Sequence, residues 1–124
     1  MSSVPSKMSN VPSKISAHVL DTALGKPAAN LSIRLDVLEP NGLFRSVSEQ
    51  RTNADGRVAE LLTSESLEAR VYRVVFETEA YLVATRQPVL YPRVEVVFRA
   101  QEGEQHYHIP LLLSPYGYTT YRGS

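Results

Sequence analysis

The stretch richest in side chains that could do chemistry is the C-terminal segment from His106 to Ser124. It holds two of the three histidines of the chain, His106 and His108, which are two positions apart. The third histidine, His18, lies near the other end of the sequence. Imidazole changes its charge near neutral pH, so histidines can act as general acids or bases. A segment this rich in aromatic and hydrogen-bonding side chains is expected to pack on the domain and to serve its function.

Period-two alternation predicts that all three histidines face outward from the core. Between 106 and 113, one face carries Tyr107, Ile109, Leu111 and Leu113, and the other carries His106, His108, Pro110 and Leu112. Near the N-terminus, Ile15, Ala17 and Val19 lie opposite Ser16, His18 and Leu20. An outward face that mixes histidines with apolar residues is typical of a subunit interface or a pocket.

Three interpretations fit the histidines from residue types and spacing alone. They can be ordinary surface residues. His-x-His on one strand with a third histidine also fits a three-His zinc site with an open position, although no cysteine or carboxylate reinforces it. The third interpretation is metal-free acid/base catalysis, in which a nearby arginine binds a carbonyl or anionic oxygen. The spacing does not decide among them.

The elements that would position these residues are short β-strands. Alternating apolar and polar residues predict strands near 15–20, 31–37, 43–51, 58–61, 70–77, 94–98 and 106–113, with a last short segment after them. Asn41-Gly42 and Asp55-Gly56 mark the clearest turns, because such pairs readily adopt positive φ. The only predicted helix covers 77–85. Seven or eight short strands with this spacing predict an all-β sandwich.

The composition favours one globular domain and excludes several classes of protein. The 124 residues carry no net charge, and no basic surface suggests nucleic acid. The absence of cysteine excludes disulfides and thiolate chemistry. The longest apolar runs are far shorter than a membrane span, and no apolar stretch typical of a signal peptide occurs near the start.

Residues 1–14 differ in composition from the rest of the chain. The sequence Val-Pro-Ser-Lys occurs twice there, at Val4–Lys7 and Val11–Lys14. Ser, Pro, Lys and Asn bury too little apolar surface to offset the entropy lost on ordering. We therefore predict a disordered N-terminal tail at 1–14, followed by a single domain at 15–124.

Four parts of the chain resemble motifs of the transthyretin-like family, in particular those of its 5-hydroxyisourate hydrolase branch. Ser16–Asp21 with Gly25–Ala28 resembles the N-terminal motif of that branch, and Thr52–Arg57 resembles its central motif. Tyr72–Phe76 is similar to its fifth strand. His106–Ser124 resembles its C-terminal signature, which ends in Tyr-Arg-Gly-Ser. The resemblance covers nearly everything outside the tail, in the right order.

The resemblance implies a fold, an assembly and a site. The fold would be the transthyretin-like sandwich of two four-stranded sheets with one short helix. The assembly would be a homotetramer, with active sites in the clefts where dimers meet. The catalytic residues would be His18, Arg57 and His108. Substrate would be bound by His18, Arg57, His106, Tyr121, Arg122, Gly123 and Ser124. No metal and no cofactor is implied.

The reaction implied is hydrolytic opening of 5-hydroxyisourate to 2-oxo-4-hydroxy-4-carboxy-5-ureidoimidazoline, a step of urate degradation in purine catabolism. We hypothesise that His108 or His18 activates water, while Arg57 holds the ring and stabilises negative charge on oxygen. One alternative is a ligand carrier without catalysis, although transthyretin, the carrier branch, lacks this set of residues. The other alternative is a three-His zinc hydrolase.

The expected partners are the small-molecule substrate and further copies of the chain, with neither nucleic acid nor a membrane. The expected compartment is the cytoplasm, with the peroxisome as the alternative, because no clear targeting signal occurs.

Overall fold

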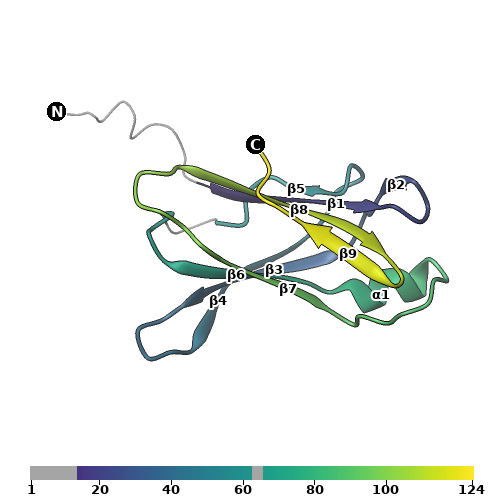
Figure 1. The fold of residues 1–124 in the computed structure, drawn as a ribbon, viewed down its shortest axis with the longest axis horizontal. Helices are drawn as coiled ribbons and strands as arrows, with labels where there is room; N and C mark the ends of the chain where they lie inside the picture. The colour runs from purple at the N-terminus through teal and green to yellow at the C-terminus, as the bar shows by residue number, and fades with distance from the viewer. Residues whose placement is uncertain (1–13, 63–65) are drawn as a thin grey trace.

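The computed structural model describes residues 14–62 and 66–124, and its strands form two layers packed face to face (Figure 1). The first layer contains β1 (Lys14–Asp21), β2 (Lys26–Pro27), β5 (Arg57–Val58), β8 (His106–Ser114) and β9 (Gly117–Thr120). The second layer contains β3 (Ser32–Leu38), β4 (Phe44–Arg51), β6 (Val71–Phe76) and β7 (Val94–Arg99). Helix α1 (Thr78–Ala84) lies between β6 and β7 in the chain.

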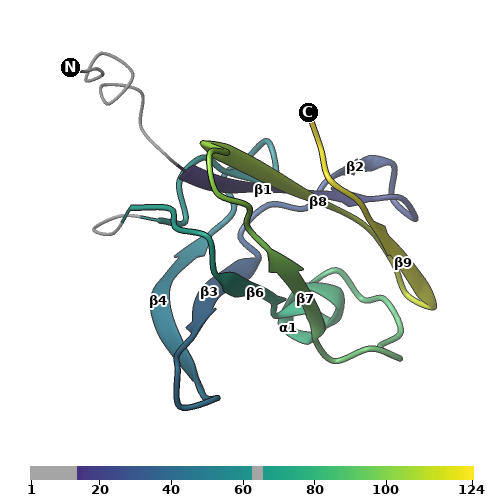
Figure 2. The ribbon, with the colours of Figure 1, turned by 60° about the vertical axis from the view of Figure 1, so that its left-hand side comes forward.

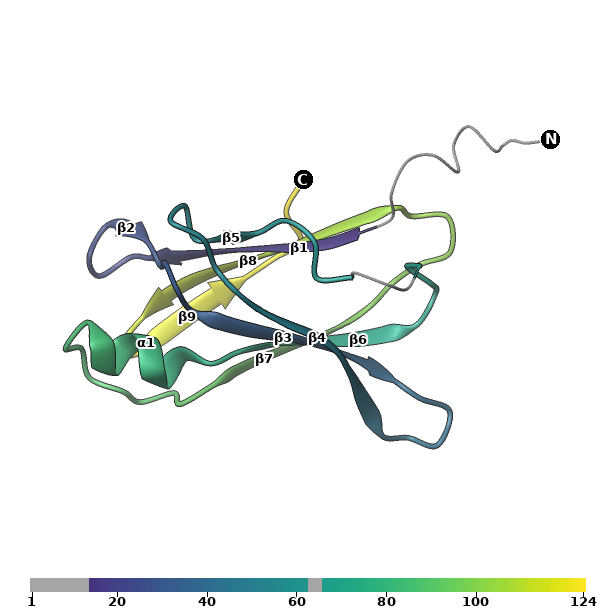
Figure 3. The ribbon, with the colours of Figure 1, turned by 180° about the vertical axis from the view of Figure 1, so that it is seen from behind.

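The sheet topology confirms the predicted all-β sandwich with one short helix. The second sheet has the order β4-β3-β6-β7. The first has the order β2-β1-β8-β9, with β5 as a fifth strand that also pairs with β1. The strands β5 and β2 pair with successive parts of the same edge of β1, first at Ala17 and His18 and then at Leu20 and Asp21 (Figure 3). Two short pieces therefore share the place of one outer strand.

The predicted strand at 58–61 is wrong in its extent, because strand pairing stops at Val58. The chain then turns toward the interior. The backbone N–H of Leu61 donates to the carbonyl of Ile15, and the Leu61 side chain is fully buried. Burial of this leucine outweighs continued pairing at the sheet edge.

The core lies between the two sheets, where the alternation of the sequence placed it. The inward side chains of β1 and β8 are buried, including those of Ile15, Val19, Ile109 and Leu111. The facing sheet contributes Ile33, Leu35, Val37, Tyr72, Val74 and Phe76, all of them buried. The outward residues of β1 and β8 are thereby held on a flat, hydrogen-bonded surface.

After β9 ends, the C-terminal segment continues antiparallel to β8 in the same register, and the chain ends above the outer face of the first sheet (Figure 2). The backbone N–H of Gly123 donates to the carbonyl of His108 at 2.8 Å, which forms an isolated antiparallel bridge. Pro110, which the alternation assigned to an outward face available to a partner, is buried. A Cβ atom built on Gly123 would lie 3.2 Å from Cγ of Pro110, so the same chain supplies the cover.

The tail predicted at 1–14 lies outside the described residues except for Lys14, which is the first residue of β1. Among the helices of the described chain, none is long and apolar enough to cross a membrane.

Candidate active site

The parallel pairing of β1 with β8 brings together histidines that are far apart in the sequence. The register places Ser16 beside His108, Lys14 beside His106 and His18 beside Pro110. Because these residues share the outward parity of their strands, their side chains gather on the outer face of the first sheet. All three histidines therefore lie on one surface, as the sequence predicted.

Arg57 joins this surface because a tight turn docks the preceding loop on β1. Gly56 has a φ of +75°, and a Cβ built on it would lie only 2.4 Å from the carbonyl oxygen of Val19. Glycine is therefore required both by the conformation and by the close approach. The side-chain oxygen of Asn53 accepts hydrogen bonds from the N–H groups of Asp55 and Arg57, which shapes the turn. The resulting pairing sets Arg57 directly beside His18.

Hydrogen bonds fix the orientation of each imidazole ring. The Ser16 hydroxyl lies 2.8 Å from Nδ1 of His108 and 3.0 Å from Nε2 of His106. His18 donates from Nε2 to the backbone carbonyl of Asp55 at 3.0 Å, since a carbonyl can only accept. The ring centroids of His18 and His108 are 6.4 Å apart, as are those of His106 and His108. One substrate molecule can therefore contact more than one ring.

A polar cavity of about 310 Å³ opens beside these rings. Its lining comes from four parts of the chain and consists of Lys14, Ser16, Ala17, Asn53, Arg57, Val58, Ala59, His106, His108 and Ser124. Its volume is at the lower end of the range of small-molecule sites. The cavity brings Arg57, His106, His108 and Ser124 of the predicted site together, and His18 lies at its margin through its contact with His108.

The electrostatic surroundings favour the neutral forms of His108 and His18. Burial lowers the pKa of His108, and the positive charge of Arg57 lowers it further, with smaller effects from His106 and His18. Burial and Arg57 also lower the pKa of His18, and its hydrogen bond to Asp55 opposes this only in part. A neutral imidazole has a lone pair that can accept a proton from water.

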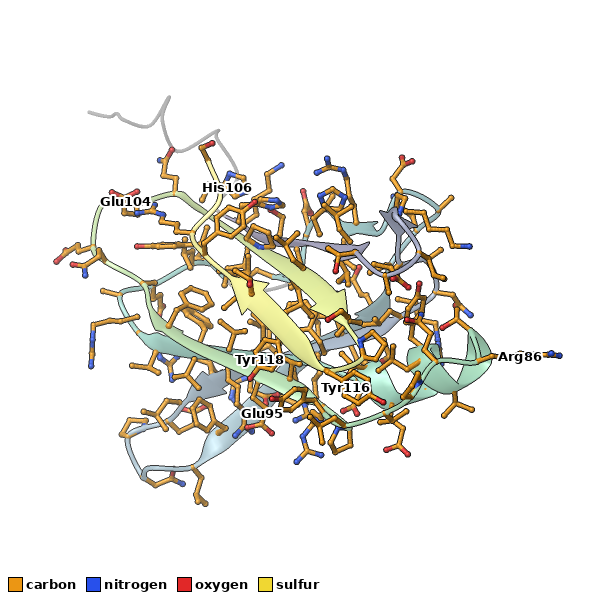
Figure 4. The ribbon with its side chains drawn as sticks, turned by 45° about the vertical axis from the view of Figure 1, so that its right-hand side comes forward. Arg86, Glu95, Glu104, His106, Tyr116 and Tyr118 are labelled. Atoms are coloured by element: carbon orange, nitrogen blue, oxygen red, sulfur yellow. The ribbon has the colours of Figure 1, made fainter. Side chains whose placement is uncertain are left out.

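Tyr121 and Arg122 lie away from the polar cavity in this chain. They line a second, more apolar hollow of about 290 Å³, together with residues of β7 and β8 such as Phe98 and Tyr107. Arg122 donates to the carboxylate of Glu104 at 2.9 Å and lies 4.4 Å from the centre of the Tyr107 ring. Figure 4 shows Glu104 in the loop before β8 and His106 beside the C-terminal segment. Arg122 thus holds this segment on the body of the domain.

The arrangement of the side chains also bears on whether the site could hold a metal ion. Among the residues described, no group of three or more His, Cys, Asp or Glu residues is arranged to hold a metal ion. The imidazole nitrogens that face one another are instead engaged by the Ser16 hydroxyl.

Sequence reasoning missed Ser16, Lys14 and Asn53 as members of the site. Ser16 carried one usable signal, since it lies two positions before His18 and so shares its face of the strand. Its contacts with His106 and His108 depend on strand pairing over about ninety positions, which the local pattern does not specify.

Comparison with known proteins places this chain in a family. The family model described as HIUase/Transthyretin family matches residues 15–123. The 5-hydroxyisourate hydrolase of Mus musculus is 45% identical over 118 residues, which cover 94% of this chain and 100% of the relative. A probable 5-hydroxyisourate hydrolase of Caenorhabditis elegans is 46% identical over 110 residues, covering 89% of this chain and 80% of the relative.

Solved structures of both branches of the family share the fold. Sea bream transthyretin in complex with thyroxine has a TM-score of 0.84 and 33% identity, with 89% of this chain and 94% of that chain covered. Klebsiella pneumoniae 5-hydroxyisourate hydrolase has a TM-score of 0.79 and 33% identity, with 90% and 99% covered. The fold therefore does not separate the enzyme from the carrier, and the side chains of the site must do so.

Proposed function

We propose that this chain, which belongs to the HIUase/transthyretin family, is a 5-hydroxyisourate hydrolase. The observation that carries the proposal is that Arg57 and His108 line one polar cavity, in a chain that matches the whole length of a named hydrolase. A neutral imidazole can act as the general base in hydrolysis of a ring amide, and a permanent cation can stabilise the negative charge that develops on the carbonyl oxygen.

In the proposed reaction, Nε2 of His108 takes a proton from water as the water oxygen attacks the ring carbonyl carbon. Arg57 donates hydrogen bonds to the carbonyl oxygen, on which negative charge develops. The ring C–N bond then breaks, and the proton on Nε2 passes to the departing nitrogen. The product is 2-oxo-4-hydroxy-4-carboxy-5-ureidoimidazoline.

We assign the base to His108 because of the nitrogens that its neighbours leave free. Nδ1 of His108 is engaged by Ser16, and in the described parts of the chain no hydrogen bond engages its Nε2. A neutral His18 carries its proton on Nε2 to donate to Asp55, so its free lone pair is on Nδ1. Because His18 is not among the residues that line the polar cavity, we assign it the role of orienting water or substrate. The proposed substrate-binding set also includes His106 and Ser124, which line the polar cavity, and Gly123, which bonds to His108. Tyr121 and Arg122 line the second hollow, and we keep them in the set as the residues that hold Gly123 and Ser124 in place.

We also propose a homotetramer with its sites in the clefts between dimers. The strands β7 and β9 are the last strands of their sheets, and both border the apolar hollow of about 290 Å³. Unpaired strand edges beside an apolar hollow favour association with another chain. Light scattering is expected to give about four chains per particle, and a fully active monomer would contradict the placement of the sites.

The activity is tested by following the decay of freshly generated 5-hydroxyisourate with and without the protein. We expect rapid decay that survives extensive chelation. Loss on chelation with recovery on adding zinc would favour the three-His zinc hydrolase. Unchanged decay together with ligand binding would favour the carrier. The cytoplasmic location, with the peroxisome as its alternative, stays a prediction that cell fractionation would test.

A further inference from the structure

We propose that Ser16 is a positioning residue that holds His108 in the tautomer with its proton on Nδ1, and that His106 is the third member of this hydrogen-bonded chain. The inference deepens the proposed hydrolase function and rests on it for its kinetic consequences. The hydrogen-bonding arrangement itself can be measured without any substrate.

The geometry places one hydroxyl between two imidazoles. Ser16 Oγ lies 2.8 Å from Nδ1 of His108 and 3.0 Å from Nε2 of His106, and both distances are typical of good hydrogen bonds. Ser16 is only 8% exposed, so water does not compete freely for the hydroxyl. The parallel register of β1 and β8 sets Ser16 beside His108, while the neighbouring pair Lys14 and His106 brings the second ring within reach.

Counting protons restricts how these three groups can bond. A serine hydroxyl has one hydrogen to donate and lone pairs with which to accept. Two neutral imidazole nitrogens cannot both accept the single hydrogen of Ser16, so at least one ring must donate to Oγ. Three arrangements satisfy this count: His108 donates from Nδ1 and Ser16 donates to His106, both of these bonds run in the opposite direction, or both rings donate to Oγ.

These arrangements differ in whether Nδ1 of His108 donates or accepts, and this decides what His108 can do. If Nδ1 of His108 donates, its Nε2 has a free lone pair that can take a proton from water. If the direction is reversed, the only lone pair of a neutral His108 points at Ser16 and cannot reach water in the cavity. A hydrolase therefore needs an arrangement in which Nδ1 of His108 donates to Oγ. The Ser16 hydroxyl is then free to donate to Nε2 of His106, which makes His106 the third member of the chain.

Because of the charges around His108, the Ser16 hydroxyl also affects how readily this ring takes up a proton. The titratable or charged groups that surround this ring are Lys14 and His18 on β1, Arg57 on β5 and His106 on β8. No carboxylate of a described residue bonds to His108, although a carboxylate is the partner that commonly orients a catalytic histidine. When Nε2 gains a proton, the bond from Nδ1 to Oγ becomes charge-assisted and stronger. Ser16 thus favours the imidazolium that Arg57 disfavours.

The first test reads the tautomer directly. Nuclear magnetic resonance of ¹⁵N-histidine-labelled protein, at a pH where His108 is neutral, is expected to show its proton on Nδ1. Ser16→Ala should reduce the population of that tautomer, and Ser16→Thr, which keeps the hydroxyl, should restore it. A matched control is Ser114→Ala, because Ser114 lies on the same face of β8 but bonds only to the carbonyl of Gly117. This control should leave the His108 signals unchanged.

The second test is kinetic. Ser16→Ala should lower kcat by roughly 10- to 100-fold, which is below the full effect of a general base, with a smaller change in KM. The acidic limb of the kcat/KM profile should move to lower pH, because loss of the acceptor at Nδ1 destabilises the imidazolium. Ser16→Thr should recover most of kcat, and Ser114→Ala should leave both kcat and the profile unchanged.

The outcomes separate this inference from the proposed function. The role of Ser16 would be overturned, even in an active hydrolase, if the proton of His108 lies on Nε2 in the unmodified protein. It would also be overturned if Ser16→Ala leaves the tautomer populations of His108 unchanged. Failure of the protein to hydrolyse 5-hydroxyisourate would overturn the proposed function instead, while the resonance measurement would still decide what Ser16 does.

Discussion

Arg57 sets the electrostatic character of the site at the scale of single residues. Its charge lowers the pKa of both His18 and His108, in addition to the effect of burial. The same charge is available to an oxygen that becomes negative during hydrolysis. In the proposed mechanism, one cation therefore both favours the neutral base and stabilises the transition state.

Replacing Arg57 with alanine should change both the rate and its pH dependence. We expect kcat/KM to fall about 10²-fold or more, the scale of a lost oxyanion-stabilising group. The pKa of His108 should rise once the cation is gone. Because the base must be neutral, the acidic limb of the profile should then move to higher pH.

Two controls accompany this prediction. Arg57→Lys keeps the charge and should leave the acidic limb near its original position. Arg51 is an exposed arginine of the other sheet, and its side chain donates to the carbonyl of Asn30. Arg51→Ala should change neither kcat/KM nor the position of the acidic limb. A profile unmoved by Arg57→Ala would show that Arg57 does not act on the base.

At this scale the sequence predicted which side chains face outward but not how they bond. Alternation in 15–20 and 106–113 placed His18, His106 and His108 on the outer face, where the structure has them. The bond from Ser16 to His108 joins positions 92 apart, through a parallel strand pair. Such pairing is decided by the packing of the whole sandwich and not by any local pattern.

At the scale of elements, a buried carboxylate ties α1 to the end of β1. Asp21 is 1% exposed and accepts hydrogen bonds from the hydroxyl of Tyr81, the side-chain amide of Gln87 and the backbone N–H of Leu24. Burial by itself would raise the pKa of Asp21. The hydrogen bonds, that of Tyr81 first, outweigh it and hold the pKa below its usual value.

Removing one hydroxyl from this anchor should destabilise the domain in a pH-dependent way. Tyr81→Phe should lower the free energy of unfolding by about 1.5–3 kcal/mol at neutral pH, the range for a hydrogen bond to a charged group. A depressed carboxylate pKa contributes stability above the unfolded value of about 4, and this is lost as the pH falls through the folded pKa. The difference in unfolding free energy between Tyr81→Phe and the unmodified protein should therefore become smaller below about pH 4.

Denaturant unfolding at several pH values measures this difference. The matched control is Tyr116→Phe, since Tyr116 is 68% exposed and a surface change of this kind costs little. Equal stabilities of Tyr81→Phe and the control at neutral pH would mean that the Tyr81 hydroxyl does not anchor α1.

Most elements could be predicted from the sequence, and the exceptions share one cause. The hairpin at Asn41-Gly42 and the helix at 77–85 follow from local turn chemistry and patterning, and both are present. The division of one outer strand into β2 and β5 was not predicted. Those two pieces are only two residues long each, and their pairing with β1 depends on where the loops between them dock.

At the scale of the whole molecule, the C-terminal segment completes the site without contributing much to the core. It is held by the exposed ion pair of Arg122 with Glu104 and by the bond from Gly123 to His108. Gly123 passes so close to the imidazole that a Cβ there would lie 2.4 Å from Cδ2 of His108. The last residue, Ser124, then reaches the polar cavity.

Deleting Tyr121 to Ser124 should therefore abolish or severely reduce turnover while the sandwich stays folded. An exposed ion pair, one backbone hydrogen bond and the contact of Arg122 with the Tyr107 ring together account for about 1–3 kcal/mol of unfolding free energy. Gly123→Ala should act in the same direction, because the added methyl group must displace either the segment or the His108 ring. The contrasting variant is Phe76→Ala, which empties a fully buried position and should cost about 3–5 kcal/mol. Thermal unfolding and hydrolysis rates of the three variants show whether the segment serves activity or stability. A truncated protein that unfolds would make the segment a structural anchor, and one that keeps full activity would remove it from the site.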